Sequence, residues 1–367
     1  MTQRIDAGRP SANSASPQKS RTPGYDHDVM VFIGRFRFFH NGHLAVMRLA
    51  LAHGRRLIVL VGSCRQARSA RNPLNFDEVS ETILGAFAPA ERSRITLVPL
   101  IDRYNDVEWT RDVQAAIQAQ TADEPARICL IGHAKDHSSY YLKMFPQWTS
   151  MAAPAVEGIS ATPMREDYFA DAEAALGRYR AQLPPNVATF LGTFARGPIY
   201  AALAEEAAFI RDYRRKWASA PYPPTFVTAD AVVVQSGHIL IIERRNNPGK
   251  GLWALPGGFV EQNERIKDSM IRELREEARL KVPTGFLEGS IKASQVFDYP
   301  YRSARGRTIT HAFLIMLAGD TAGLPKVRGG DDARHAFWLP ISALDPERMF
   351  EDHWHIIETM LSYASRG

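Results

Sequence analysis

Three glutamates that follow a Gly-Gly turn constrain this chain more than any other feature. Glu273, Glu276 and Glu277 have the spacing i, i+3 and i+4, which places them on one face of a helix. Like charges so placed repel one another, but a hard divalent cation reverses the sign, because Mg²⁺ and Mn²⁺ prefer carboxylate oxygens. A solvated acidic face explains the charges alone. It does not explain the glycine, the more distant glutamate and the arginine that precede them in register.

The whole segment reads Gly258-x5-Glu264-x7-Arg272-Glu273-Leu274-x-Glu276-Glu277. From Gly258 to Leu280 it resembles the Nudix box, the signature of hydrolases that cleave a nucleoside diphosphate linked to another group. The family has glycine where this chain has Arg279. That glycine ends the helix in a left-handed conformation, which costs a non-glycine residue roughly 1 kcal/mol.

The resemblance to the Nudix family implies a role for each matching residue. Glu273, Glu276 and Glu277 are expected to bind Mg²⁺ or Mn²⁺, with Glu276 and Glu277 also catalytic. Arg272 is expected to orient a box carboxylate through a salt bridge. Glu264 is expected to act indirectly, by orienting groups that contact the metal without binding it. The general base stays open between a box glutamate and a glutamate on a later loop.

Length and composition bound the class of protein. A chain of 367 residues predicts two domains or more, and 45% hydrophobic residues supply real cores. The two cysteines, Cys64 and Cys129, exclude a disulfide framework and favour a reducing, cytoplasmic location. No apolar run approaches the roughly 20 residues that span a bilayer, so we expect no membrane segment. Residues 1–28, which carry Ser, Arg and Pro, are predicted to form a disordered tail.

The net charge of +5 indicates either a negatively charged binding partner or positive side chains that simply face solvent. The arginines are scattered rather than blocked, and part of the excess lies in residues 1–28. Small substrates rich in phosphate explain this balance, so nucleic acid is not expected as a partner. Self-association into a homo-oligomer is left open by the sequence.

Short apolar runs alternate with helix-compatible sequence in the first half of the chain. This alternation predicts a parallel sheet with helical crossovers, an α/β fold. Ligands of such sheets bind beyond the carboxyl ends of the strands. The expected strands are 30–33, 57–61, 95–100 and 128–131.

Two histidines flank a glycine directly after the first expected strand. His40 and His43, with Gly42 between them, would lie at the start of the first helix, where free N–H groups and the helix dipole suit phosphate. A single histidine in a turn usually has no role. The pattern His-x-Gly-His, preceded by Gly34 and Arg35, resembles the nucleotidylyltransferase superfamily. That resemblance implies that both histidines contact the phosphates of a nucleoside triphosphate and act in catalysis, and that Gly34, Arg35 and Gly42 line the substrate site.

A second segment, Ile159-Ser160-Ala161-Thr162-Pro163-Met164-Arg165, resembles the Ile-Ser-x-Thr-x-x-Arg signature of the same superfamily. The resemblance implies that Ser160, Thr162 and Arg165 hold the β- and γ-phosphates, with Arg165 catalytic. A hydroxyl pair at a helix start and a guanidinium one turn later suit this task. An ordinary helix cap explains each piece, but not two motifs in the expected order about 120 residues apart.

Segments around residues 71–73, 102–109 and 132–136 narrow the resemblance to the nicotinamide mononucleotide (NMN) adenylyltransferase branch. In that branch an aromatic side chain stacks on the nicotinamide, and Trp109 is the candidate here. A tryptophan of the core near a strand end is the alternative. The branch has proline where this chain has Phe38, so residues 35–39 depart from its usual pattern.

The second half begins after a stiff segment, Ala220-Pro221-Tyr222-Pro223-Pro224, which separates helices expected near 187–194 and 199–217 from β-rich sequence. We therefore predict a tail (1–28), a Rossmann-like nucleotidylyltransferase domain with a parallel sheet (29–190), a helical connector and linker (191–224) and a Nudix domain (225–367). A hairpin is expected around Ser236-Gly237. The remaining strands and the acidic helix fit the α/β/α sandwich of the Nudix fold.

The order of the two parts resembles the bacterial family of bifunctional NMN adenylyltransferase/ADP-ribose pyrophosphatases. The resemblance implies that ATP and NMN give NAD and pyrophosphate in the first domain, and that ADP-ribose gives AMP and ribose 5-phosphate in the second. Arg302 and Arg305, in a loop after the box, are expected to bind substrate, although arginine-rich loops are most often solvated surface. The alternatives are another mononucleotide in the first domain, NADH or a dinucleoside polyphosphate in the second, or a second domain that only senses a ligand.

Overall fold

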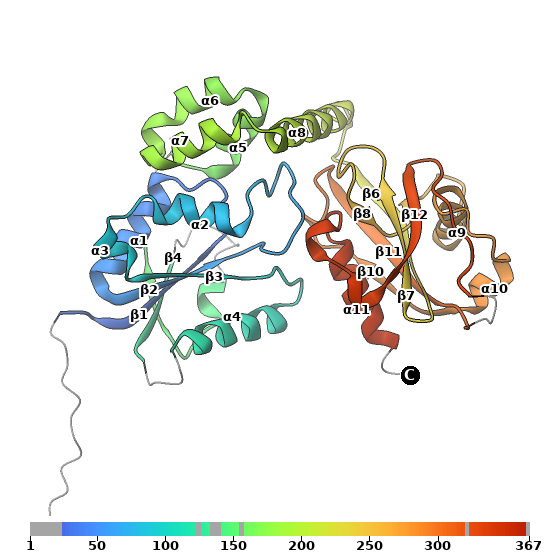
Figure 1. Cartoon of the computed structure of the whole chain (residues 1–367), viewed down its shortest axis with the longest axis horizontal. Coiled ribbons are helices and arrows are strands. Elements are labelled where there is room, and N and C mark those ends of the chain that lie inside the picture. The colour runs from blue at the N-terminus through green and yellow to red at the C-terminus, as the bar shows by residue number, and fades with distance from the viewer. Residues whose placement is uncertain (1–23, 122–125, 133–140, 154–157, 320–322, 365–367) are drawn as a thin grey trace, which may run out of the picture.

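The computed structural model describes residues 24–121, 126–132, 141–153, 158–319 and 323–364. Two sheets with their own helices lie side by side and are joined by a helical segment (Figure 1). The first strand begins at His27, so His27 and Asp28 belong to the first sheet although the tail was expected to extend through them. The rest of that tail, through residue 23, lies outside the described residues. None of the described helices is long and apolar enough to cross a membrane.

The first sheet has the strand order β3-β2-β1-β4-β5, and all its neighbouring strands are parallel. This confirms the predicted α/β class. The four strands expected from sequence are β1 to β4, whereas β5 was not foreseen. The elements are β1 (His27–Gly34), α1 (Asn41–His53), β2 (Gly54–Val61), α2 (Phe76–Leu84), α3 (Pro89–Arg92), β3 (Ile95–Pro99), α4 (Asp106–Thr121), β4 (Ile128–Gly132) and β5 (Thr149–Ala152).

Alternate residues of the central strand β1 feed two separate cores, as the period of two requires. Met30 and Phe32 pack with α1, α2 and later helices on one face. Val29 and Val31 pack with α4 on the other face. The sheet is therefore covered on both sides, and its open carboxyl edge is left for ligands.

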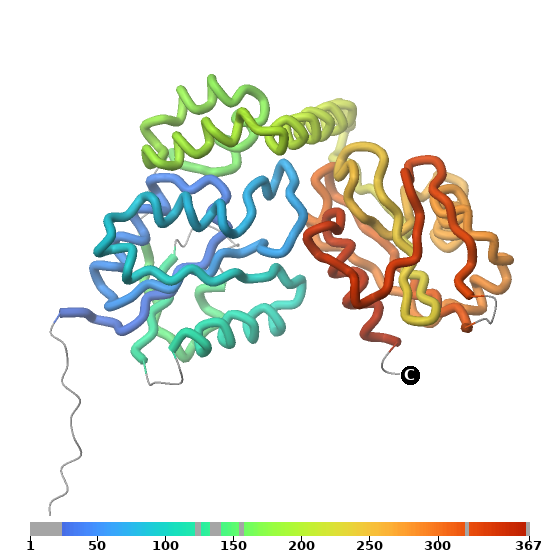
Figure 2. Tube along the Cα trace, in the orientation of Figure 1, coloured from blue at the N-terminus to red at the C-terminus, as the bar shows by residue number. Residues whose placement is uncertain are grey.

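Four helices and a short 3-10 turn follow the first sheet: α5 (Ala161–Ala170), α6 (Ala172–Tyr179), η2 (Arg180–Gln182), α7 (Pro185–Phe194) and α8 (Pro198–Lys216). The helices expected near 187–194 and 199–217 are confirmed. Val187 and Leu191 of α7 and Leu203 of α8 join the first core. The proposed domain limit at residue 190 thus falls inside α7, and α8 extends from the first sheet toward the second (Figure 2).

The second sheet has the order β10-β11-β6-β7-β12, with β8 paired to β7 and β9 paired to β6. The expected hairpin is confirmed, because β6 and β7 pair antiparallel up to a turn at Ser236-Gly237, both with positive φ. The elements are β6 (Thr225–Gln235), β7 (His238–Arg244), β8 (Trp253–Ala254), β9 (Gly257–Phe259), α9 (Ile266–Glu277), α10 (Thr284–Gly289), β10 (Ile291–Phe297), β11 (Arg307–Met316), β12 (Ala333–Pro340), η3 (Ile341–Ala343), η4 (Pro346–Arg348) and α11 (His353–Ala364).

Helices cover both faces of this second sheet. Met270 and Leu274 of α9 pack on one face. Ile356 and Met360 of α11 pack on the other. The arrangement is the predicted α/β/α sandwich, and it holds α9, which carries the three glutamates, against the strand β9 that precedes it.

Candidate active sites

The two histidines of the first motif meet at the start of α1. His40 is the N-cap residue, with extended backbone angles, and its Nδ1 accepts a hydrogen bond from the backbone N–H of His43 at 3.4 Å. The two imidazole rings stack with their centroids 3.7 Å apart. Both rings, together with the buried Gly42, line a cavity of about 1020 Å³. The structure therefore places this motif where the sequence analysis expected it, at the mouth of a parallel sheet.

The second motif lines the same cavity from α5. Ser160 is the N-cap residue of that helix, yet its side chain makes no capping hydrogen bond. Its hydroxyl is therefore available to a ligand, as is that of the exposed Thr162. Arg165 is half-buried beside them, and burial is the main reason that its pKa is lowered. Two segments far apart in the chain thus converge on one cavity.

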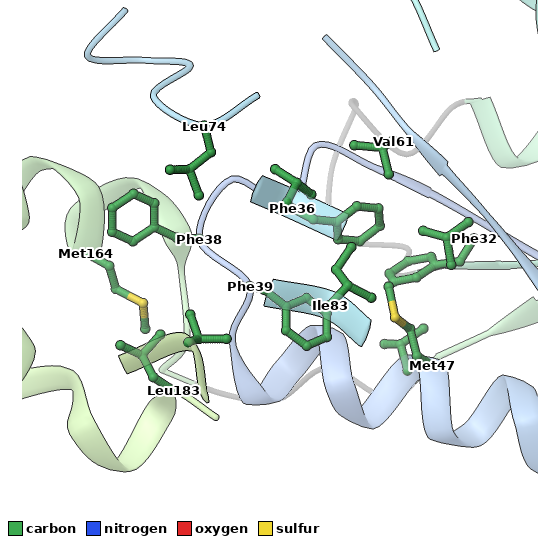
Figure 3. Packing of buried hydrophobic residues seen from close by; sticks show 14 of the residues in the cluster. Phe32, Phe36, Phe38, Phe39, Met47, Val61, Leu74, Ile83, Met164 and Leu183 are labelled. Atoms are coloured by element: carbon green, nitrogen blue, oxygen red, sulfur yellow. The ribbon is translucent and has the colours of Figure 1, made fainter. Parts of the chain in front are cut away.

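The departure at Phe38 is absorbed by the core. Phe36 takes the left-handed φ of 52°, which turns the chain so that Phe38 points inward. There Phe38 meets Tyr168 edge-on at 5.3 Å and lies among Leu74, Met164 and Leu183 (Figure 3). A large apolar side chain fixes this loop by burial instead of by the restricted φ of proline.

Gly34, a predicted substrate-binding residue, has a role in the backbone structure of the sheet and does not line the cavity. Its carbonyl accepts from the N–H of Gly62 at 2.8 Å, which joins the ends of β1 and β2. A Cβ at Gly34 would lie 2.6 Å from the ring of Phe36, so a larger residue would require this buried ring to move. Gly34 does not line the cavity of the two histidines or the adjoining cavity of Trp109.

Several arginines of this cavity were not foreseen as site residues. The guanidinium of Arg37 is buried and donates to the carbonyls of Gly62 and Ser63 at 2.9 and 2.7 Å, while its Nε and Nη1 have no hydrogen-bond partner among the described residues. Arg71 and Arg214 also line the cavity. Arg71 stands in a segment that the sequence analysis noted, but Arg214 lies in a basic helix end that looks like ordinary surface.

Trp109, the candidate for nicotinamide stacking, lies in an adjoining cavity of about 270 Å³. Its ring is half-buried and meets Tyr141 and Phe145 at centroid distances of 6.1 and 5.9 Å. Arg35 and Arg71 line both cavities, so the two spaces meet at these arginines. The expected site is therefore divided into two compartments. The segment His133–Asp136, noted from sequence, lies outside the described residues.

The second candidate site is the acidic helix, where Arg272 binds three carboxylates at once. Its guanidinium donates to Glu264 at 2.8 and 3.1 Å, to Glu273 at 2.8 Å and to Glu276 at 2.9 Å. These hydrogen bonds hold the pKa of Glu264 at about 2. The salt bridges have the form predicted for Arg272, and they neutralise part of the repulsion along the helix.

The other box carboxylates are buried. Glu277 accepts a hydrogen bond from the N–H of Gly257 at 3.0 Å, and burial raises its pKa to about 8. Burial also raises the pKa of Glu273, although Arg272 opposes the shift. A Cβ at Gly258 would lie 2.4 Å from Glu273 Oε1, which explains why the segment needs glycine there.

The donor chemistry of this helix fits a hard divalent cation. Glu273 and Glu277 are buried carboxylates whose charged forms are disfavoured by the loss of water and by neighbouring carboxylates, Glu276 for Glu273 and Glu273 for Glu277, and a cation would relieve both effects. Arg272 forms ion pairs with Glu273 and Glu276, whereas Glu277 accepts a hydrogen bond from the backbone N–H of Gly257. Within the described ranges, no three acidic, histidine or cysteine side chains surround one common point.

Arg279 keeps the backbone conformation of the glycine that it replaces. Its φ is 50°, in the left-handed region, and the N–H of Leu280 reaches back to the carbonyl of Leu274 at 3.5 Å. The N–H groups of Arg328 and Gly330 cover the carbonyls of Ala278 and Glu277. The helix exit is therefore preserved despite the changed residue.

The two arginines predicted to bind substrate in the second domain have different surroundings. Arg302 is buried and forms a two-pronged ion pair with Asp352 at 2.8 Å for both contacts, and its Nη1 donates to Thr310. The guanidinium of Arg302 therefore bonds to buried groups of the protein. Arg305 is less constrained and lies over the rings of Phe259 and Phe350, 5.0 and 6.0 Å from their centroids.

Comparison with protein families and solved structures agrees with this division. Residues 31–166 match the cytidylyltransferase-like family, and residues 224–360 match the NUDIX domain family. The chain is 38% identical to a nicotinamide/nicotinic acid mononucleotide adenylyltransferase of Acinetobacter baylyi, over 50% of this chain and 94% of the relative. It is 34% identical to an ADP-ribose pyrophosphatase of Methanocaldococcus jannaschii, over 35% of this chain and 72% of the relative.

One solved structure covers both halves together. A bifunctional NMN adenylyltransferase/ADP ribose pyrophosphatase from Francisella tularensis, complexed with AMP and a manganese ion, superposes with a TM-score of 0.85 at 32% identity. The match covers 92% of this chain and 99% of that one. The similarity therefore extends to the order and packing of the two domains.

Proposed function

Because this chain belongs to the family of bifunctional NMN adenylyltransferase/ADP-ribose pyrophosphatases, we propose that its two adjoining cavities carry the first activity and its acidic helix the second. The observation that carries the first assignment is the meeting of two distant motifs in one cavity. The second rests on the buried carboxylates Glu273 and Glu277 of α9 and on Arg272, which binds Glu273 and Glu276.

In the first domain, a phosphate oxygen of NMN attacks the α-phosphorus of ATP in line. The new P–O bond forms as the bond from the α-phosphorus to the bridging oxygen of the β-phosphate breaks, so NAD and pyrophosphate are the products. No covalent enzyme intermediate is needed, and catalysis is positioning with charge stabilisation. His40 and His43 stabilise the α-phosphate, and Ser160, Thr162 and Arg165 hold the departing pyrophosphate.

The compartments assign the two substrates. ATP, entering as its Mg²⁺ complex, places its phosphates in the larger cavity, among the histidines and arginines. NMN occupies the smaller cavity, where Trp109 stacks on its nicotinamide ring. Arg35 and Arg71 lie where the cavities meet and therefore face the reacting phosphates.

In the second domain, ADP-ribose is hydrolysed to AMP and ribose 5-phosphate. Glu273, Glu276 and Glu277 hold a divalent cation, Mg²⁺ or Mn²⁺. When bound, the cation polarises the diphosphate and lowers the pKa of a water. Arg272 orients Glu273 and Glu276 through its ion pairs, and it would give up part of these ion pairs if the carboxylates held the cation. Arg305 remains the candidate for a contact with substrate phosphate, while Arg302 keeps its loop in place through Asp352.

The decisive experiment measures AMP release from ADP-ribose with Mg²⁺ or Mn²⁺, in wild type and in Glu276→Gln, together with NAD formation from ATP and NMN. We expect Glu276→Gln to lose AMP release roughly a hundred- to thousandfold, the effect of removing one charge-stabilising group, and to keep NAD formation. Glu261→Gln, an exposed glutamate before the helix, is the matched control.

Two results would overturn the proposal. Intact AMP release in Glu276→Gln would remove the helix from the reaction. Absence of AMP release in wild type, with NAD formation intact, would make the second domain a ligand sensor or a hydrolase of NADH or a dinucleoside polyphosphate. A substrate panel containing these compounds separates the last two cases.

A further inference from the structure

One loop of the second domain touches the catalytic cavity of the first. Residues 298–306 connect β10 to β11, yet Arg71 of the first domain donates a hydrogen bond from Nη1 to the carbonyl of Tyr301. The same guanidinium lies over the ring of Tyr301, 5.9 Å from its centroid. Arg214 of α8 donates to the carbonyl of Ala304 at 3.0 and 2.6 Å.

This contact makes the loop a wall of both cavities. Tyr301, Ser303 and Ala304 line the larger cavity, which also holds the two histidines and Arg165. Tyr299 and Tyr301 line the smaller cavity together with Trp109 and Tyr104. The site for ATP and NMN is thus enclosed by residues of both domains, although all its predicted residues lie in the first.

The loop is held against the first domain by further contacts. Tyr299 stacks on Tyr104 with ring centroids 4.5 Å apart. Beside it, the buried carboxylate of Glu206 accepts hydrogen bonds from the N–H of Ala70 at 2.7 Å and from the N–H of Gly249 at 3.0 Å. Ala70 precedes Arg71 in the first domain, and Gly249 belongs to the second domain. The carboxylate of Glu206 therefore links the two domains. Figure 2 shows the loop of the first domain that reaches the second at this place.

The arginines of the cavity repel one another, so Arg71 needs contacts that hold its guanidinium in place. Loss of water lowers the pKa of Arg71 and of Arg165; repulsion from Arg35 adds to both shifts, and repulsion from Arg71 adds to that of Arg165. Crowded guanidiniums tend to turn away from each other and into solvent. A carbonyl acceptor and an aromatic face oppose that tendency for Arg71, and both belong to Tyr301.

We propose that Tyr301 is a positioning residue for adenylyl transfer, which acts by holding Arg71 at the junction of the two cavities. The second domain then contributes to the first reaction through the loop that also carries Arg302 and Arg305. This inference rests on the proposed assignment of the cavities to ATP and NMN.

The test uses the full chain and steady-state formation of NAD from ATP and NMN. Tyr301→Ala removes the ring, and we expect kcat/KM to fall about two- to fivefold, the effect of losing one exposed cation–π contact. Tyr301→Phe keeps the aromatic face and should match wild type, because the contact with Arg71 does not use the hydroxyl. Tyr222→Ala, which removes an exposed tyrosine of the linker, is the matched control.

A double-mutant comparison tests the route through Arg71. In an Arg71→Gln background, which lacks the guanidinium, Tyr301→Ala should cause no further loss. The inference is overturned if Tyr301→Ala equals wild type, if Tyr301→Phe is equally impaired, or if the two losses multiply. A wild type that forms no NAD would instead overturn the assignment of the cavities, so the two failures are distinguishable.

Discussion

The two domains face the phosphates of their substrates with opposite charges. The first lines an open cavity of about 1020 Å³ with Arg35, Arg71 and Arg165, and these cations stand ready for an anion. The second presents glutamates that are neutralised by Arg272 or buried against Gly257. The cations of the first site are therefore in place without a ligand, whereas in the proposed function the second site would exchange internal ion pairs for a metal ion. Pre-arranged charge suits a reaction that is mainly positioning, and exchangeable charge suits one that recruits a metal.

The two domains also absorb their unusual residues differently. Phe38, where related enzymes have proline, is accommodated by burial in the core, so side-chain packing replaces backbone rigidity. Arg279, where the Nudix box has glycine, retains the left-handed backbone instead. The first solution adds buried apolar surface, while the second carries a conformational cost. A departure from a family pattern therefore has to be judged from its surroundings.

The largest expected effect is a loss of one activity and not the other when a histidine of the first site is replaced. His43→Ala should lower NAD formation roughly a hundred- to thousandfold, because a group that stabilises the charge of the transition state is removed. AMP release from ADP-ribose should stay within about twofold of wild type, because His43 lies in the first domain and α9 in the second. His53→Ala, at the other end of the same helix, is the control. Equal losses in both reactions would mean that His43 supports the fold rather than the chemistry.

The next largest effect concerns the ion pairs between Arg272 and the glutamates of the second site. Arg272→Ala should lower Mn²⁺ affinity and AMP release about ten- to a hundredfold, as expected when a residue that orients metal ligands is lost. Titration of Mn²⁺ binding, followed calorimetrically, measures the affinity directly. Arg275→Ala removes an exposed arginine of the same helix and should leave both quantities unchanged. Tighter binding in Arg272→Ala would show that the arginine competes with the cation instead of preparing its ligands.

A smaller effect tests the conformational cost at Arg279. Arg279→Gly should raise the free energy of unfolding by about 1 kcal/mol, because glycine adopts a positive φ without steric penalty. Arg279→Ala removes the same side chain but keeps Cβ, so it should give no such gain. Denaturant unfolding of the three proteins provides the comparison. A stabilised Arg279→Ala would show that the side chain, and not the backbone, carries the cost.

Sequence patterns predicted those parts of the molecule that depend on short segments. The parallel sheet, the sandwich, the hairpin and the meeting of His40 and His43 with Ser160 follow from local motifs and from the rule that ligands bind at carboxyl strand ends. The role of Arg302 did not, because its partner Asp352 lies 50 residues later and only burial joins them. Tyr301 could not be placed from sequence either. Its neighbour Arg71 lies 230 residues away, so only the packing of the two domains brings them together.

The smallest effect concerns the contact between the domains and depends on pH. His355 of the second domain meets Tyr104 of the first edge-on at 4.5 Å. Burial, which is aided by the charges of Arg103 and Arg302 and opposed by Glu108, lowers the pKa of His355 to about 4. Between that value and the ordinary pKa of a histidine, about 6.5, the unfolded chain binds more protons than the folded one. Stability that is fully present above pH 6.5 is therefore lost as the pH falls through this window.

The loss between pH 7.5 and pH 6.0 should stay below about 1 kcal/mol, because only the upper edge of the window is crossed. It should appear as a lower melting temperature at pH 6.0. His355→Phe keeps an aromatic ring beside Tyr104 without a titrating group, so its melting temperature should change less over the same interval. His335→Phe, which replaces an exposed histidine, should retain the response of wild type. If His355→Phe responds like wild type, the acid sensitivity does not come from His355, and this contact between the domains does not depend on pH in the predicted way.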